Sequence, residues 1–418
     1  RRRWREGGRV VSLLLPARLS DASHVAAAVL RRLGVRPRPR TPSGQYQPAA
    51  LFTDRGVRVV SVEGLLSLAS GSGAGTGHYG GGAARALLLE GGQWLWPPVE
   101  VGHAHELTDL VAPGVVTRVV TLSLKPLVVE VENFLDGGEN GHIIERAKPH
   151  MAKSGVALKD ADKGKAAKEF RTSSQYFLPT TRDPTLEKID RRVSWLTRIP
   201  ISHAEYIQVL KYNHLEHYSA HHDYFDPAAY ASNQQMLRSV EHGAKNRRQQ
   251  PSPQPSLQPS AQALPPPPPH ASARPSRRPP LPPPLAPSAT NENGPRLATV
   301  FFYLNSLVGE GEAPESGGGQ TNFPRAATAA YPDGGPPVHD YFDCSRGLSV
   351  YPQEGKIIIF YSMLPNGEMD DYSLHGGCDV LFSNATKWSA NFWLWNKPYH
   401  FVDPARRRAT KELTEEWI

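Results

Sequence analysis

The stretch HYSAHHDYFDP (residues 217–227) places three histidines and two aspartates within eleven positions. Such a density of imidazole and carboxylate groups indicates a metal site. Side chains two residues apart point to the same face of a β-strand. His221 and Asp223 have this spacing, whereas His222 points to the opposite face. The stretch therefore predicts a strand that presents His221 and Asp223 together as two ligands of one metal ion.

A second pair and a near-copy of the motif compete with this interpretation. His214 and Glu216 form a rival pair of a histidine and a carboxylate with the same spacing. The sequence HDYFDC at 339–344 nearly repeats HDYFDP of the opening stretch, but Val338 stands where the first ligand would be. We expect this copy to be a structural turn or strand in which His339 is not a ligand.

A non-haem Fe(II) site with two histidines and one carboxylate needs a further histidine from a facing strand. His375, in SLHGGCDV, lies between two strand candidates and is our candidate. Twelve residues later, Lys387 begins the apolar strand KWSANFWLW. Burying a lysine there is costly without an anionic partner, which a dicarboxylate co-substrate would supply. The alternative is that the stem of Lys387 reaches solvent at the open end of the strand.

Composition limits the functions that the chain can have. The 418 residues include 40 prolines and 36 glycines and carry a net charge of +7. We expect no nucleic-acid binding, because basic and aromatic residues are not interleaved. No apolar stretch reaches the roughly 18 residues needed to span a bilayer. Two cysteines are too few for a disulfide scaffold or a four-ligand zinc site.

The chain changes character near residue 119. Residues 1–118 form a low-complexity region, rich in Gly, Ala and Arg, to which we assign no role. From 119 to 418 we expect one α+β domain whose β part is a sandwich or barrel. A Pro-rich insertion at about 232–292 should loop out as an extended, polyproline-like segment. It is either inert or a substrate-like segment.

Helix and strand signals support this division of the chain. Asp183 and Pro184 predict the start of a helix that ends before Ile199 and buries one face. Runs of β-branched and aromatic residues predict strands. The candidate strands are 119–135, 206–213, 297–305, 356–362 and 389–396.

From about 119 to 399 the chain resembles the prolyl 4-hydroxylases of plants and algae. Several stretches match in the family's order. They are LSLKPLVVEVENFL with IIERAKPHM, RTSSQYFL, RIPISHAEYIQVLKYN, YSAHHDYF, RLATVFFYLN, GGGQTNFP, RGLSVYPQEGKIIIFYSMLPNGEMDDYSLHGGC and KWSANFW. The resemblance implies a double-stranded β-helix (jelly-roll) core with flanking N-terminal helices. It also implies an iron(II)- and 2-oxoglutarate-dependent dioxygenase that hydroxylates proline in proline-rich peptides or hydroxyproline-rich glycoproteins.

The resemblance assigns roles residue by residue. It makes His221, Asp223 and His375 the iron ligands. It places Lys387 and Tyr212 at the far carboxylate of 2-oxoglutarate, with Thr321 lining the same pocket. Arg296, Trp393, Arg171 and Ser173 correspond to residues that act on the peptide.

Three further expectations follow from the resemblance. L-Ascorbate would restore over-oxidised iron, and the compartment would be the lumen of the endoplasmic reticulum or Golgi. In an oxidising compartment Cys344 and Cys378 could pair as a disulfide. The expected partner is a proline-rich peptide or protein, and the oligomeric state stays open.

The chain departs from the family pattern at three places. Trp395 stands where many relatives carry a histidine, GGGQT (317–321) replaces GGET, and His375 and Lys387 are twelve rather than ten residues apart. Two alternatives follow. One is a dioxygenase acting on another peptide residue or a small molecule. The other is a degraded, non-catalytic module that binds proline-rich chains.

Overall fold

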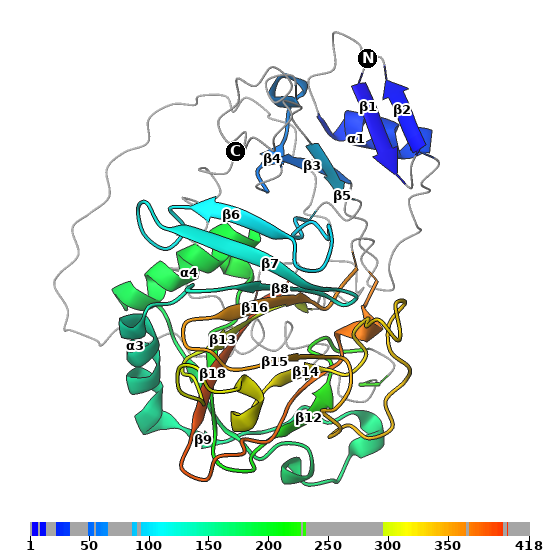
Figure 1. Ribbon diagram of the computed structural model, residues 1–418. Helices are drawn as coiled ribbons and strands as arrows, with labels where there is room; N and C mark the ends of the chain where they lie inside the picture. The colour runs from blue at the N-terminus through cyan, green and yellow to red at the C-terminus, as the bar shows by residue number, and fades with distance from the viewer. Residues whose placement is uncertain are drawn as a thin grey trace, which may run out of the picture.

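The structure is a computed structural model that describes residues 2–6, 9–13, 22–33, 49–53, 56–65, 86–89, 93–226, 229–230, 296–364, 368–395 and 399. Within these residues a nine-stranded sheet packs against a four-stranded sheet (Figure 1). The Pro-rich insertion expected at about 232–292 lies outside the described residues.

The large sheet contains the strand candidates 119–135, 206–213, 297–305, 356–362 and 389–396. Its order is β6-β7-β8-β16-β13-β18-β11-β10-β9, and its strand pairings are antiparallel. The bounds are β6 Ala104–Thr108, β7 Val116–Leu124, β8 Leu127–Val131, β9 Ala152–Lys153, β10 Ser174–Leu178, β11 Ile207–Tyr212, β13 Arg296–Tyr303, β16 Ile357–Tyr361 and β18 Lys387–Trp395. These assignments confirm the strand predictions.

The small sheet is also antiparallel and carries the first part of the opening motif. The predicted strand ends at His221, so Asp223 lies in a bend beyond it and not on the same strand. Its order is β12-β17-β14-β15. The bounds are β12 Tyr218–His221, β14 Thr321–Phe323, β15 Leu348–Val350 and β17 His375–Gly377. Phe323 and Val350 of this sheet pack with Tyr212 and Phe360 of the large sheet, so apolar side chains fill the space between the sheets.

Successive side chains along each strand of the large sheet point to opposite faces of the sheet, as strand geometry requires. On β18, Ala390, Phe392 and Leu394 belong to the core on the helix-covered face. On β11, Leu210 and Tyr212 instead join the core between the two sheets. Both observations follow the alternation of side chains along a strand and place Tyr212 on the inner face.

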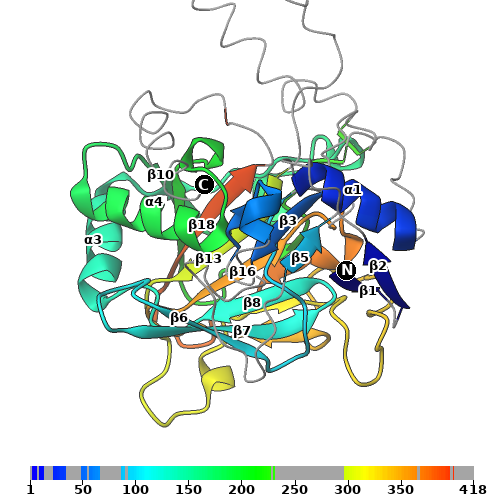
Figure 2. The same ribbon diagram turned by 90° about the horizontal axis from the view of Figure 1, so that it is seen from above.

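Two helices cover the outer face of the large sheet at one end of the molecule (Figures 1 and 2). They are α3 (Gly137–Ala147) and α4 (Pro184–Thr197). The Asp183 side chain caps α4 by accepting a hydrogen bond from the Leu186 amide, and Arg198 ends the helix in the left-handed conformation. The predicted start and end of this helix are thereby confirmed. Short 3-10 helices span Lys148–His150, Asp160–Asp162, Ala167–Glu169, Ile201–His203, Pro314–Gly317 and Asp371–Ser373.

The region before residue 119 contains regular structure. It comprises β1 (Arg2–Glu6), β2 (Arg9–Leu13), α1 (Ala22–Leu33), β3 (Ala50–Thr53), β4 (Arg58–Val59) and β5 (Ala86–Leu89). Trp94 and Trp96 pack into the core of the large sheet, and the Trp96 amide donates to the Tyr361 hydroxyl at 3.2 Å. The boundary expected at 119 falls inside β7, which is hydrogen-bonded to β6, so the large sheet begins at Ala104.

No helix in the described part of the chain combines the length and the apolar character that a membrane span requires.

Candidate active site

The antiparallel pairing of β12 with β17 brings the three predicted metal ligands together. His221 and His375 are directly opposite each other in this pairing, and Asp223 follows two residues after His221. One potential ligand atom from each of the three side chains lies within 4.8 Å of the other two. The Nε2 atoms of His221 and His375 are 3.7 and 3.6 Å from the oxygens of Asp223. This is a facial set of two imidazoles and one carboxylate.

Hydrogen bonds fix both imidazoles in the tautomer that a metal needs. His221 Nδ1 lies 2.9 Å from the Ser219 carbonyl, and His375 Nδ1 lies 2.9 Å from the Ser373 carbonyl. Because a carbonyl only accepts, each Nδ1 carries the hydrogen and each Nε2 keeps a lone pair toward the centre. Burial lowers the pKa of His375 to about 4 despite the opposing charge of Asp223, so this ring is neutral at pH 7.

A hydrogen bond also holds the carboxylate of Asp223 in place. Its Oδ2 accepts a hydrogen bond of 2.6 Å from the hydroxyl of Thr299 on β13. Burial alone would raise the pKa of Asp223, but His375 and His221 outweigh burial and hold it far below its usual range. Thr299 was not identified from the sequence, although it shares the inner face of β13 with Phe301 and Tyr303. An isolated polar side chain on that face is the signal that could have found it.

The other candidate ligands are not members of the triad. His222 Nε2 lies 3.1 Å from the Asp371 carbonyl, and its ring stacks on Tyr224. Glu216 of the rival pair accepts from the backbone amide of Asn213 and does not approach a second ligand. Among the described residues, the group that fits a metal is the triad alone.

Lys387 is buried among aromatic side chains on the inner face of the large sheet. Its side chain is 1% exposed, and its Nζ lies 5.1 Å from the ring centre of Tyr212, which is its cross-strand partner on β11. Its Nζ also lies 5.4 Å from the ring centre of Phe301. No ion pair to Lys387 occurs within the described ranges, and burial lowers its pKa to about 7. The alternative, in which the stem of Lys387 reaches solvent, does not hold.

The altered GGGQT stretch packs against the side chain of Lys387. Gly319 has a φ of +65°, and a Cβ there would lie 3.3 Å from Cδ of Lys387 and 2.6 Å from Leu307. Only glycine allows the chain to turn and approach the lysine so closely. Thr321 is buried on β14, and its Oγ1 accepts a 2.9 Å hydrogen bond from the Tyr303 hydroxyl.

Arg296 belongs to a cluster that joins β13, β18 and the start of β11. Its guanidinium forms two hydrogen bonds with Glu205, of 2.6 and 3.1 Å, and stacks 3.6 Å from the ring centre of Trp393. Burial alone would lower the pKa of Arg296, but the Glu205 carboxylate raises it and keeps the side chain charged. Trp395 donates to Glu205 at 2.8 Å, so the tryptophan that replaces the family's histidine helps to position Arg296 through this carboxylate. Sequence reasoning missed Glu205.

A cavity of about 890 Å³ connects two members of the triad, His221 and Asp223, with the predicted substrate residues. His221, Asp223, Arg171, Arg296 and Trp393 all line it. The Nη2 of Arg171 and the Nε1 of Trp393 are buried without an acceptor among the described residues. Ser173 is buried beneath the wall, where its hydroxyl accepts from Arg171 Nε at 2.8 Å. The site therefore offers unsatisfied donors to a ligand.

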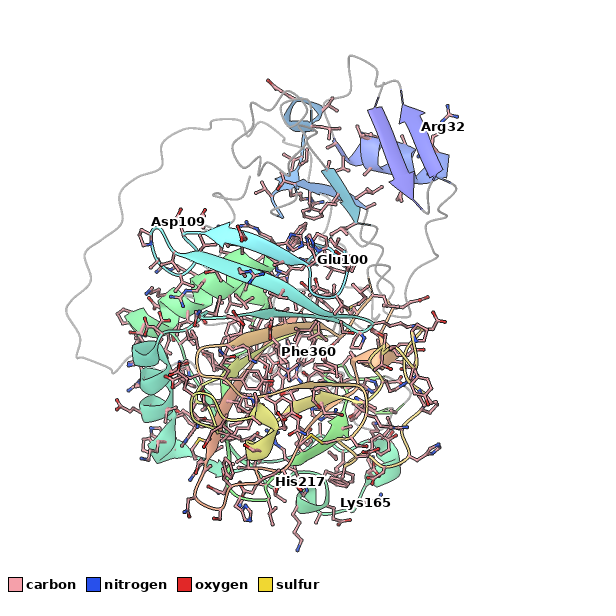
Figure 3. All side chains as sticks on the ribbon, in the orientation of Figure 1. Arg32, Glu100, Asp109, Lys165, His217 and Phe360 are labelled. Carbon is pink, nitrogen blue, oxygen red and sulfur yellow. A yellow bond between two sulfur atoms is a disulfide. The ribbon has the colours of Figure 1, made fainter. Side chains whose placement is uncertain are left out.

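The second copy of the motif forms another wall of this cavity. His339 and Tyr341 line it, and the Tyr341 carbonyl accepts a 2.7 Å hydrogen bond from Ala220 of β12. Cys344 and Cys378 form a disulfide that ties this wall to the end of β17. Figure 3 places Lys165, which also lines the cavity, at the end of the molecule farthest from the N-terminal elements, and Phe360 between the sheets.

The donor set, the buried lysine and the cavity define a class of protein, the non-haem Fe(II) and 2-oxoglutarate-dependent dioxygenases. The sequence model of the 2OG-Fe(II) oxygenase superfamily matches residues 284–395, which include His375 and Lys387.

Comparison with known proteins narrows the class. The chain is 32% identical to probable prolyl 4-hydroxylase 10 of Arabidopsis thaliana over 65% of its length and 70% of that protein. It is 30% identical to probable prolyl 4-hydroxylase 3 of the same plant over 65% and 70%. The chain belongs to the prolyl 4-hydroxylase family. The solved viral collagen prolyl hydroxylase of Paramecium Bursaria Chlorella virus-1 shares 18% identity over 64% of this chain and 94% of its own, with a TM-score of 0.33.

Proposed function

We propose that this protein is a peptidyl-proline 4-hydroxylase that uses Fe(II), 2-oxoglutarate and O2 and releases succinate and CO2. The observation that carries the proposal is the cavity that is lined both by two members of the metal triad, His221 and Asp223, and by two residues with unsatisfied donors, Arg171 and Trp393. Its expected substrates are proline-rich peptides or hydroxyproline-rich glycoproteins.

The residues present fit both cofactors. His221, Asp223 and His375 would hold Fe(II), because two neutral imidazole nitrogens and one carboxylate are its preferred donors. Lys387, Tyr212 and Thr321 would hold 2-oxoglutarate, since a buried lysine without a counter-ion matches the far carboxylate of a dicarboxylate. When bound, these two groups supply the oxidising chemistry that places one oxygen atom of O2 on C4 of the proline.

The residues of the chain would bind and orient the peptide. Proline lacks an amide hydrogen, so a proline-rich chain presents mostly carbonyl acceptors. Arg171 and Trp393 carry donors that need such acceptors. Arg296, fixed by Glu205, presents its guanidinium against Trp393 beside the metal ligand Asp223. The burial of the triad between the two sheets limits the access of water to it.

Three further proposals accompany this function. We propose that the two facing sheets form a double-stranded β-helix, because both are antiparallel and share one apolar interior. We propose that L-ascorbate restores the iron after unproductive turnover. We also propose a lumenal location in the endoplasmic reticulum or Golgi, which the disulfide between Cys344 and Cys378 supports, since disulfides persist in oxidising compartments.

One assay tests the proposed function. Purified protein is supplied with Fe(II), 2-oxoglutarate and ascorbate, with and without a proline-rich peptide, and succinate and hydroxyproline are measured. We expect succinate and hydroxyproline in equal amounts, and both should depend on the peptide. Succinate that forms independently of the peptide would favour another substrate. Absence of both products would favour a non-catalytic binding module.

A further inference from the structure

The Pro-rich part of the sequence is joined at both ends to the wall of the cavity. Tyr230 immediately precedes the undescribed residues 231–295 and Arg296 immediately follows them, and both side chains line the cavity. Between these two residues the sequence carries prolines from Pro251 to Pro287, with an uninterrupted run at Pro265–Pro269. The chain thus tethers a proline-rich sequence to the site that we propose binds such sequences.

Both attachment points are held by contacts within the described fold. The Tyr230 hydroxyl donates to the Ala157 carbonyl at 3.4 Å, and its ring packs edge-on against Phe225 with centroids 5.4 Å apart. Arg296 is held by two hydrogen bonds to Glu205 and by stacking on Trp393. The tether therefore starts and ends at defined positions on the rim of the cavity.

The chemistry of the cavity matches that of the tethered sequence. Aromatic side chains such as Tyr218 and Phe225 line it, and grooves lined by aromatic residues are a recurrent means of binding proline-rich chains. The buried donors of Arg171 and Trp393 lack acceptors among the described residues. A proline-rich segment supplies carbonyl acceptors without bringing amide donors that would compete for them.

Tethering also favours this occupant over a free peptide. The effective concentration of a tethered ligand is millimolar for short flexible linkers and falls as about the −3/2 power of linker length. At the micromolar enzyme concentrations of an assay, the segment of the same chain would therefore meet the cavity far more often than a segment of another molecule.

We infer that residues 251–287 enter this cavity and are hydroxylated in cis, so that the chain is its own substrate. The inference rests on the proposed function. Each turnover consumes one O2 and one 2-oxoglutarate. One oxygen atom enters a proline C–H bond as hydroxyl, the other enters the new carboxylate of succinate, and the 2-oxoglutarate carboxyl leaves as CO2. The electrons come from the C–H bond and from the oxidised keto acid.

The test uses the full chain with Fe(II), 2-oxoglutarate and ascorbate, and mass spectrometry locates added oxygen in residues 251–287. Wild-type protein is mixed with an isotope-labelled His375→Ala chain, which carries the same segment but lacks a metal ligand. A free synthetic peptide of residues 251–287 is assayed in parallel at saturating concentration. A chain with Pro265–Pro269 replaced by alanine is the matched control for the site of modification.

We expect added oxygen in the wild-type segment, none in the labelled segment, and a fraction modified per minute that is unchanged by a tenfold dilution of the enzyme. A rate that falls about tenfold on dilution, together with modification of the labelled chain, would overturn hydroxylation in cis. Hydroxylation of the free peptide with an unmodified tethered segment would overturn the inference and leave the proposed function standing. Modification of neither would overturn both.

Discussion

Replacing Lys387 with methionine should stabilise the fold and at the same time weaken the binding of 2-oxoglutarate. The wild-type ammonium is 1% exposed and has aromatic rings but no carboxylate around it within the described residues. Burial lowers its pKa from 10.5 to about 7, so the ligand-free fold carries the cost of a buried charge at and below neutral pH. Replacing buried charges with apolar groups of similar volume often stabilises proteins by about 1–4 kcal/mol.

The free energy of unfolding of the wild type depends on pH because Lys387 binds its proton less tightly in the folded chain than in the unfolded chain. Between pH 7 and 10.5 the unfolded chain keeps the lysine proton and the folded chain has lost it. The unfolded state therefore binds more protons, and the free energy of unfolding of the wild type rises with pH by up to about 1.4 kcal/mol per unit. This contribution is absent from Lys387→Met, so the advantage of the variant should be largest near pH 6.5 and should shrink by pH 9.

The affinity of Lys387→Met for 2-oxoglutarate should fall, whereas its stability should rise. Loss of a charge-assisted contact of about 1.5–3 kcal/mol weakens 2-oxoglutarate binding by about 10- to 150-fold. Urea denaturation without ligand at pH 6.5 and 9 measures stability, and anaerobic calorimetric titration measures affinity.

Lys356→Met is the matched control. Lys356 is also buried, but its Nζ lies 3.8 Å from Glu130, which would lose its partner. This variant should lower stability and leave the affinity for 2-oxoglutarate unchanged. A Lys387→Met chain that is less stable than wild type at pH 6.5, or that binds 2-oxoglutarate normally, would refute the reasoning.

Five other substitutions test neighbouring parts of the site. His222→Ala should retain 2-oxoglutarate turnover and His221→Ala should abolish it, and the reverse result would show that the assigned strand register is wrong. Thr299→Val removes the hydrogen bond to the metal carboxylate and should lower Fe(II) affinity by about 10- to 100-fold in a metal titration, with little change in thermal stability. Arg296→Lys should raise the KM for peptide by tenfold or more, because lysine cannot form the paired contact with Glu205, and an unchanged KM would contradict its role. Cys344→Ser removes the disulfide to Cys378, which has a sequence separation of 34, and should lower the free energy of unfolding by about 3–4 kcal/mol in denaturant titrations. Reduction of the disulfide in the wild type should lower the free energy of unfolding by a similar amount.

Local rules predicted those parts of the fold that depend on neighbours in sequence. Runs of β-branched and aromatic residues predicted the strand at 206–213, and capping chemistry placed the start of α4 at Pro184. The same rules could not find Glu205 as the partner of Arg296, because the two are 91 residues apart in sequence and meet only through sheet pairing. They also could not show that Lys387 is sealed from solvent, since its enclosure depends on the backbone turn at Gly319.

The near-copy of the motif illustrates why a sequence comparison can identify what a segment lacks and still miss what it does. HDYFDC at 339–344 lacks the first metal ligand, and it contributes no member to the triad. Its Tyr341 carbonyl nevertheless accepts from the Ala220 amide, one residue before His221, and Cys344 is bonded to Cys378, three residues after His375. The Phe170 carbonyl accepts from Ser219 on the same strand. The strands that carry the two histidines are thus restrained by contacts outside their mutual pairing, which keeps the ligands in place before a metal binds.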